Sequence, residues 1–222
     1  LQTISSRDAS GNWTTHVVII DTADMTVTGT TPDMAGTASG IYDRGVIVDP
    51  DNEFRAVQVT NPSSSNSTTT ITVIDTSTGE VLGTTPIDGV ARDVVFGNHG
   101  STVVATAQVT GSPGGIGGNG GAGGDGGAGG NGGGIGGGGS SSSVNVAVIE
   151  TGSGSQLGTT YQAVGDGRMP VQFSPDGSRI VIVTSPGSSQ TLVGVINTTT
   201  GLGVGSPVSV NGYDTGTGSL FF

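Results

Sequence analysis

The sequence predicts an all-β protein built from repeated four-stranded units, and three observations lead to this prediction. No stretch of the 222 residues has the apolar spacing of a helix. Short runs rich in Val, Ile and Thr alternate with turns of Gly, Pro, Asp and Ser. One short phrase also recurs four times along the chain, which indicates an internal structural repeat.

The recurring phrase is an isoleucine followed by Asp, Glu or Asn and then threonine. It begins at Ile20, Ile74, Ile149 and Ile196. Nine residues after each isoleucine stands a glycine, namely Gly29, Gly83, Gly158 and Gly205. The isoleucine phrase ends a third strand, c, and the glycine lies in a fourth strand, d. Ahead of them, each unit has an apolar strand a, ending near Val48, Phe96 or Phe173, and a β-branched strand b, near Val57, Val104 or Val181.

The repeat length predicts the architecture. Setting aside a glycine-serine insert of roughly 34 residues leaves about 47 residues per repeat, within the range of about 40 to 50 for one blade of a β-propeller. The chain starts in a strand b and ends in a new strand a at Leu220, which gives sixteen strands, or four blades. We therefore expect one β-propeller domain over residues 1–222, either a closed four-bladed ring or an arc of a larger one.

Two segments resemble a known repeat family. Residues 73–79 (Val-Ile-Asp-Thr-Ser-Thr-Gly) and 173–179 (Phe-Ser-Pro-Asp-Gly-Ser-Arg) are similar to the YVTN-type β-propeller repeats of bacterial surface and secreted proteins. The resemblance covers most of the chain outside the insert. It implies the propeller fold, but such propellers include binding modules, surface-layer components and lactonase-like enzymes, so it does not imply one activity.

The insert, residues 111–143, lies between strands b and c of one blade and holds 20 of the 44 glycines between Gly111 and Gly139. Its Gly-Gly-X series predicts a disordered loop. The tract resembles the glycine-rich segments of mycobacterial PE-PGRS proteins, which together with the absence of lysine implies an actinobacterial protein. Residues 120–128 loosely match a calcium-binding nonapeptide, but only alanine fills its apolar position, so no metal site is expected.

The composition excludes several classes of function. A net charge of −11 argues against nucleic acid and anionic membranes as partners, because both require a basic surface. The absence of cysteine excludes disulfides, thiol catalysis and zinc-thiolate sites. No apolar run approaches 18 residues, so no transmembrane segment is expected. No cofactor is expected either. The chain begins with Leu1 and is interpreted as an excerpt or a processed piece, secreted or held at the cell surface or envelope.

The candidate site is the face that carries the variable b-to-c and d-to-a loops, because binding residues usually lie on variable loops. Three arginines precede strand a at equivalent positions, each near an aspartate: Arg44 with Asp43, Arg92 with Asp93, and Arg168 with Asp166. At the mouth of the central channel they could clamp a small anionic ligand. The simpler interpretation is that they pair with the aspartates. Trp13, expected in a b-to-c loop of this face, is either an anchor for a partner or a cap on an apolar edge.

Other chemistry-bearing residues are explained structurally. Asp21, Asp75 and Glu150 each precede a tight turn, where a short carboxylate accepts backbone N–H groups, so they are not expected to form a catalytic pair. His16 and His99 fall on opposite faces and cannot share a metal. We therefore expect a non-enzymatic interaction or structural module that binds a protein or cell-envelope component. The alternative is a lactonase-like hydrolase that would use Asp43, Asp93 and Asp166, with Arg168 steadying an oxyanion.

Overall fold

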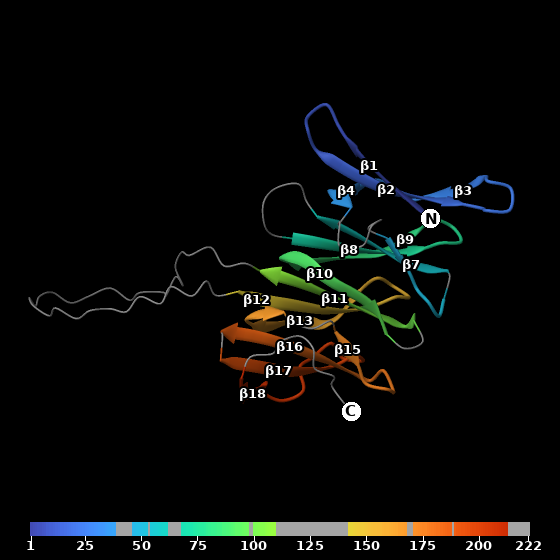
Figure 1. Cartoon of the computed structure of the whole chain (residues 1–222). Coiled ribbons are helices and arrows are strands. Elements are labelled where there is room, and N and C mark those ends of the chain that lie inside the picture. The colour runs from blue at the N-terminus through green and yellow to red at the C-terminus, as the bar shows by residue number, and fades with distance from the viewer. Residues whose placement is uncertain are drawn as a thin grey trace, which may run out of the picture.

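The computed structural model describes residues 1–38, 46–52, 54–61, 68–97, 100–109, 142–167, 171–187 and 189–212. In these residues the protein consists of β-strands grouped into four antiparallel sheets, with no α-helix. Figure 1 shows the sheets following one another in chain order, from the N-terminal sheet at one end of the molecule to the C-terminal sheet at the other. None of the described residues form a helix long and apolar enough to cross a membrane.

The four sheets have the following strands. The first contains β1 (Gln2–Arg7), β2 (Trp13–Ile20), β3 (Val27–Thr30) and β4 (Met34–Ala35). The second contains β5 (Thr37–Ala38), β6 (Val46–Val48), β7 (Arg55–Asn61), β8 (Thr68–Asp75) and β9 (Val81–Asp88). The third contains β10 (Val90–Phe96), β11 (Thr102–Val109), β12 (Ser143–Glu150) and β13 (Gln156–Val164). The fourth contains β14 (Asp166–Gly167), β15 (Gln172–Phe173), β16 (Arg179–Gly187), β17 (Gln190–Asn197) and β18 (Val208–Asn211).

The predicted order of strands a, b, c and d is confirmed in the second, third and fourth sheets, and the order b, c and d in the first. In the third sheet the pairing runs β10-β11-β12-β13, and the recurring isoleucine is the last or last but one residue of strand c in every sheet. The described parts of strand a are β5 and β6 in the second sheet and β14 and β15 in the fourth, and residues 39–45 and 168–170 between them lie outside the described residues. The expected last strand at Leu220 and most of the glycine-rich insert, residues 110–141, lie outside the described residues.

The hydrophobic core lies between successive sheets. One cluster joins the second and third sheets and includes Val57, Ile71, Val103 and Ile149, each with no exposed surface. A second cluster joins the third and fourth sheets, and a small third cluster joins the first and second. The extensive contacts between strands of different sheets all join sheets that are consecutive in the chain. The described part of the molecule is therefore an open arc of four blades.

Buried amide side chains also connect neighbouring sheets. Gln108 in β11, which is 3% exposed, donates from Nε2 to the Ser143 carbonyl at 3.1 Å. Its Oε1 accepts a bond from the Gly167 amide in the fourth sheet at 3.2 Å. Asn145 in the third sheet donates to the Asp88 carbonyl in the second at 2.9 Å. These bonds satisfy polar groups at the sheet boundaries, where an unpaired group would be costly.

The threonine of the recurring phrase links the two turns at one end of the second, third and fourth sheets. Thr151 donates its hydroxyl to the Gly100 carbonyl, and its amide bonds the Ser101 carbonyl at 3.1 Å. Thr198 bonds the Gly177 carbonyl in the same way, at 2.8 Å. The a-to-b and c-to-d turns are thus held together at what we call the turn face, opposite the face of the b-to-c and d-to-a loops.

Candidate functional site

The structure describes only part of the predicted arginine face. Arg44, Asp43 and Arg168 lie outside the described residues, so their predicted arrangement around a channel stays a prediction. Arg92 lies in β10 at a bulge, where the register with β11 shifts between Ala91 and Asp93. Its side chain is exposed, as a ligand-binding arginine would require.

Asp93 is half-buried and joins two sheets. Its Oδ2 accepts a hydrogen bond from the Val171 amide at 3.2 Å, just before β15 of the fourth sheet. Asp166 is also half-buried and opens β14, where it pairs with Ser185 of β16. Asp166 thus opens the first strand of its sheet, whereas Arg92 and Asp93 lie inside β10 and not before it as predicted. Asp93 contributes to the contact between sheets.

Trp13 does not lie in a loop, so this part of the prediction is wrong. It is the first residue of β2 and pairs with Arg7 at the end of β1. The loop is shorter than predicted because Asp8 closes it: the Asp8 amide bonds the Asn12 carbonyl, and the Asp8 carboxylate accepts the Asn12 amide at 2.8 Å. The half-buried indole still lies at the loop-face end of the first sheet.

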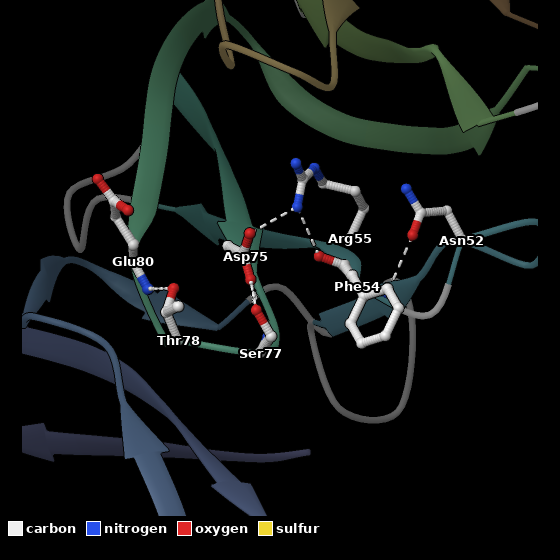
Figure 2. A network of polar contacts seen from close by, with 7 residues as sticks. All are labelled: Asn52, Phe54, Arg55, Asp75, Ser77, Thr78 and Glu80. Atoms are coloured by element: carbon white, nitrogen blue, oxygen red, sulfur yellow. Dashed lines mark hydrogen bonds and ion pairs between the residues drawn. The ribbon is translucent and has the colours of Figure 1, made fainter.

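The acidic residues of the recurring phrase bond within their turns: Asp75 and Asp21 accept backbone N–H groups, as predicted, while Glu150 accepts a side-chain hydroxyl. Figure 2 shows Asp75, whose Oδ1 accepts the Ser77 amide at 2.9 Å and the Ser77 hydroxyl at 2.5 Å. Glu150 accepts the Ser153 hydroxyl at 2.6 Å, and Asp21 accepts the Ala23 amide at 2.8 Å. His16 lies within β2, with Nδ1 3.3 Å from a carboxylate oxygen of Asp33, while His99 lies outside the described residues.

An ion pair that the sequence reasoning did not identify joins strands b and c of the second sheet. Arg55 and Asp75 are opposite each other in register, and the guanidinium Nη1 lies 2.7 Å from Asp75 Oδ2 (Figure 2). The same nitrogen donates to the Phe54 carbonyl at 2.9 Å. The Ser77 hydroxyl and amide, and then Arg55, hold the pKa of Asp75 below its ordinary value. These two contacts give Arg55 a structural role.

A groove of about 400 Å³ opens on the turn face between the third and fourth sheets. The third sheet contributes Thr102 and Glu150, at the adjoining ends of β11 and β12, and Leu157 of β13. The fourth sheet contributes the β15–β16 turn, with Asp176 and Ser178, and the turn after β17. The groove is thus formed by turns that the repeat places at the same end of two neighbouring sheets.

The groove is acidic and rich in hydroxyl groups. The Ser174 hydroxyl, followed by the amide and hydroxyl of Ser178, lowers the pKa of Asp176 to about 2, so this carboxylate is ionised at neutral pH. Glu150 is exposed and supplies the second carboxylate. Hydroxyls of Ser101, Thr102, Ser178 and Thr199 complete the polar lining. Such a lining can accept hydrogen bonds from a cation or a polyhydroxylated molecule.

Sequence reasoning missed this groove because it treated the turn face as purely structural. Glu150 and Asp176 are 26 residues apart in the sequence and come from different repeats. The one available signal was that acidic turn residues recur at the same end of every sheet. Within the described residues, no three His, Asp or Glu side chains are grouped in a way that could hold a metal ion.

Comparison with solved structures supports the fold. The chain is similar to an acylaminoacyl peptidase from Pyrococcus horikoshii, with a TM-score of 0.50, 11% identity and coverage of 94% of this chain. It also matches a Bacteroides fragilis protein described as a candidate 6-phosphogluconolactonase (TM-score 0.46, 10% identity, 94% of this chain). A third match is the β-propeller domain of the Trilobed protease from Pyrococcus furiosus (TM-score 0.36, 11% identity, 70% of this chain). The four consecutive antiparallel sheets of the chain itself make this a β-propeller fold.

The likeness is limited to the fold. The chain spans 30% of the peptidase, 54% of the lactonase-type protein and 38% of the protease propeller domain. No protein-family model matches the sequence, and the search of curated proteins found no match. The β-propeller fold predicted from the repeat is thus confirmed, whereas the activity of this propeller has to be argued from its own side chains.

Proposed function

We propose that this propeller is a non-enzymatic binding module whose turn-face groove takes a cationic group of a protein partner. The observation that carries the proposal is the groove itself, about 400 Å³ between the third and fourth sheets. Its described lining includes the carboxylates of Glu150 and Asp176 and no basic side chain. A Lys or Arg side chain of the partner would complement this charge.

The remaining lining suits such a side chain. Leu157 offers apolar surface for the methylene stem of a lysine or arginine, while the hydroxyls of Thr102 and Ser178 can accept bonds from its charged end. The net charge of −11 would favour the approach of a basic partner and would be screened by salt. Binding should therefore weaken as ionic strength rises.

The test uses the peptide acetyl-Arg₄-amide as the probe, with affinity measured by calorimetry at low salt. Glu150→Gln should weaken binding up to about fivefold, because an exposed ion pair contributes about 0.2–1 kcal/mol. Glu80→Gln, which removes the same charge from the exposed turn of the second sheet, is the matched control. Equal effects of the two substitutions would mean that the peptide responds to net charge and not to the groove.

The wider setting of the module is also a proposal. The resemblance of its repeats to YVTN-type propellers, and of its insert to PE-PGRS tracts, supports a secreted or envelope-bound actinobacterial protein that binds a protein or envelope component. Arg44, Arg92 and Arg168 would then form a second contact on the loop face. Replacing all three with alanine should reduce retention of the protein on envelope extracts, and unchanged retention would remove the arginines from this account.

Lactone hydrolysis is the second candidate function. It is favoured by the half-buried Asp93, which follows the exposed Arg92 at the bulge inside β10, so that a general base and an oxyanion partner would be close together. The reaction would add water to the lactone carbonyl and open the ring to a hydroxy acid. Turnover of glucono-δ-lactone above the spontaneous rate, lost in Asp93→Asn with an unchanged circular dichroism spectrum, would support it. Turnover unaffected by Asp93→Asn would exclude Asp93 as the base.

A further inference from the structure

The groove lies where an arginine side chain stands at the preceding sheet boundary. In the second sheet, Arg55 is the first residue of β7 and pairs with Asp75, the last residue of β8. In the third sheet, Thr102 is the first residue of β11 and pairs with Glu150, the last residue of β12. The two pairs are therefore equivalent positions of the repeat, at the turn-face end of strands b and c.

Side chains at this position enter the boundary with the next sheet. Residues two apart in a strand lie on the same face of the sheet. Arg55 stands two residues before Val57, which packs into the cluster shared with the third sheet. Thr102 stands two residues before Val104, which packs into the cluster shared with the fourth sheet. Arg55 thus faces the third sheet, whereas Thr102 faces the fourth sheet and lines the groove.

The guanidinium of Arg55 is held by a carboxylate and a carbonyl. Its Nη1 lies 2.7 Å from Asp75 Oδ2 and donates to the Phe54 carbonyl at 2.9 Å (Figure 2). The same carbonyl accepts the Thr76 amide at 3.1 Å. The other carboxylate oxygen, Asp75 Oδ1, accepts the Ser77 hydroxyl. The second sheet therefore shows how this position of the repeat binds an arginine side chain.

The third sheet repeats the two acceptors without the arginine. The Ser101 carbonyl accepts the Thr151 amide at 3.1 Å and, with two lone pairs, can accept a second hydrogen bond. Glu150 Oε2 accepts the Ser153 hydroxyl at 2.6 Å, and among the described residues no basic side chain pairs with this carboxylate. Because Thr102 has a short side chain, the place that the arginine fills in the second sheet is open here, as part of a groove of about 400 Å³.

We propose that the groove selects the guanidinium of an arginine of the partner protein over the ammonium of a lysine. This inference rests on the proposed function and narrows it to one side chain. A guanidinium carries N–H donors on three nitrogens in one plane, whereas an ammonium carries its donors on one atom. One edge of the guanidinium bonds Glu150 and the Ser101 carbonyl, as in the second sheet. Its remaining N–H groups bond the hydroxyls of Ser178 and Thr199 across the groove.

The first test compares acetyl-Arg₄-amide with acetyl-Lys₄-amide, which carry equal charge, by calorimetry at low salt. The wild-type protein should bind the arginine peptide roughly threefold more tightly or better, because each further hydrogen bond adds a factor of about 2 to 12. Glu150→Gln should reduce this preference, whereas the control Glu80→Gln should keep it.

The outcomes separate the two proposals. If wild type binds both peptides equally and Glu150→Gln weakens both, the arginine preference is overturned and the cationic groove stands. A preference that Glu150→Gln leaves intact would overturn it as well. If Glu150→Gln weakens binding no more than Glu80→Gln does, the proposed function itself is wrong, and the arginine preference falls with it.

The second test supplies the arginine from the chain itself. In Thr102→Arg the introduced side chain should pair with Glu150 as Arg55 pairs with Asp75, and so occupy the groove. Binding of acetyl-Arg₄-amide should fall several-fold further than in Thr28→Arg, which adds the same charge at an exposed position of the first sheet. Urea unfolding is the second readout: Thr102→Arg should raise the folding equilibrium constant up to about fivefold, and only while Glu150 is present. Peptide binding equal to that of Thr28→Arg, or a stability change that persists in the Glu150→Gln background, would overturn the proposal.

Discussion

The carboxylate of Asp176 organises its own turn. Its Oδ1 accepts the Ser174 hydroxyl at 2.6 Å and the Ser178 amide at 3.0 Å, while Oδ2 accepts the Ser178 hydroxyl at 2.9 Å. Because these bonds stabilise the ionised form, the pKa falls from the ordinary 3.8 to about 2. The same residue thus closes a structural turn and supplies fixed negative charge to the groove.

This pKa predicts a dependence of stability on pH. A carboxyl group whose pKa is lower in the folded protein stabilises the fold fully above about pH 4 and loses that contribution as the pH falls toward about 2. Asp176→Asn should therefore lower stability at pH 5 and narrow the difference between stabilities at pH 5 and pH 2.5. Urea unfolding of both proteins at the two pH values is the measurement. If both proteins lost the same free energy of unfolding between pH 5 and pH 2.5, the low pKa assigned to Asp176 would be contradicted.

The buried amide of Gln108 predicts a second effect at a single residue. Gln108→Leu removes the bonds to Ser143 and Gly167 while keeping an apolar side chain of similar size. Leaving these partly buried peptide groups without partners should lower the free energy of unfolding by roughly 1 kcal/mol. Gln190→Leu, at an exposed position, should change it by less than about 0.5 kcal/mol. Chemical unfolding that gives equal effects for the two variants would show that the bridge between sheets is unimportant.

At the scale of single elements, two glycines between strands c and d allow the cost of a left-handed backbone to be measured apart from the cost of a steric contact. Gly154 and Gly205 both have left-handed backbones, with φ 66° and 70°, but only Gly154 touches a neighbouring sheet. Gly205→Ala should cost about 1 kcal/mol through its conformation alone. Gly154→Ala should cost more by at least about 1 kcal/mol, because its Cβ meets the Gly83 backbone. Thermal and urea unfolding would measure the difference between the two variants. Equal losses of stability would argue against tight packing between the second and third sheets.

Much of each element could be predicted from the sequence because the repeat carries local signals. The isoleucine phrase fixes the end of strand c, and an acidic side chain after it bonds the following backbone, as at Asp75. These interactions span only a few residues and so appear as short motifs. The bounds of β2 were less predictable, since Trp13 joins the strand only because Asp8 closes a short loop.

The candidate site was less predictable than the strands. Its groove forms where Glu150 of one sheet and Asp176 of the next come together, and their separation depends on how two sheets pack. The contact between Asp93 and Val171 likewise crosses a sheet boundary. Periodicity identifies the strands of each sheet, but it carries no information on the spacing between sheets, which side-chain packing sets. The arginine face remains a prediction beyond the described residues at Arg44 and Arg168.

For the whole molecule, the ends of β11 and β12 predict how the insert affects stability. Val109 and Ser143 are paired, so the intervening segment of about 33 residues closes a hairpin. Shortening it to about 8 residues is two halvings of loop length, which should raise the free energy of unfolding by about 1.2 kcal/mol. Equilibrium unfolding of the shortened protein is the measurement. A marked loss of stability would indicate that the glycine-rich residues contribute contacts of their own.

The restriction of extensive contacts to consecutive sheets has a consequence for how the molecule opens. Among the described residues, each inner sheet is held on both sides, whereas the first and fourth sheets are held on one side, as in a linear chain of coupled units. Local unfolding should therefore begin at the two ends and advance inward. Hydrogen exchange would reveal it as a gradient, with the amides of β8 and β11 exchanging last and those of β1 and β18 first.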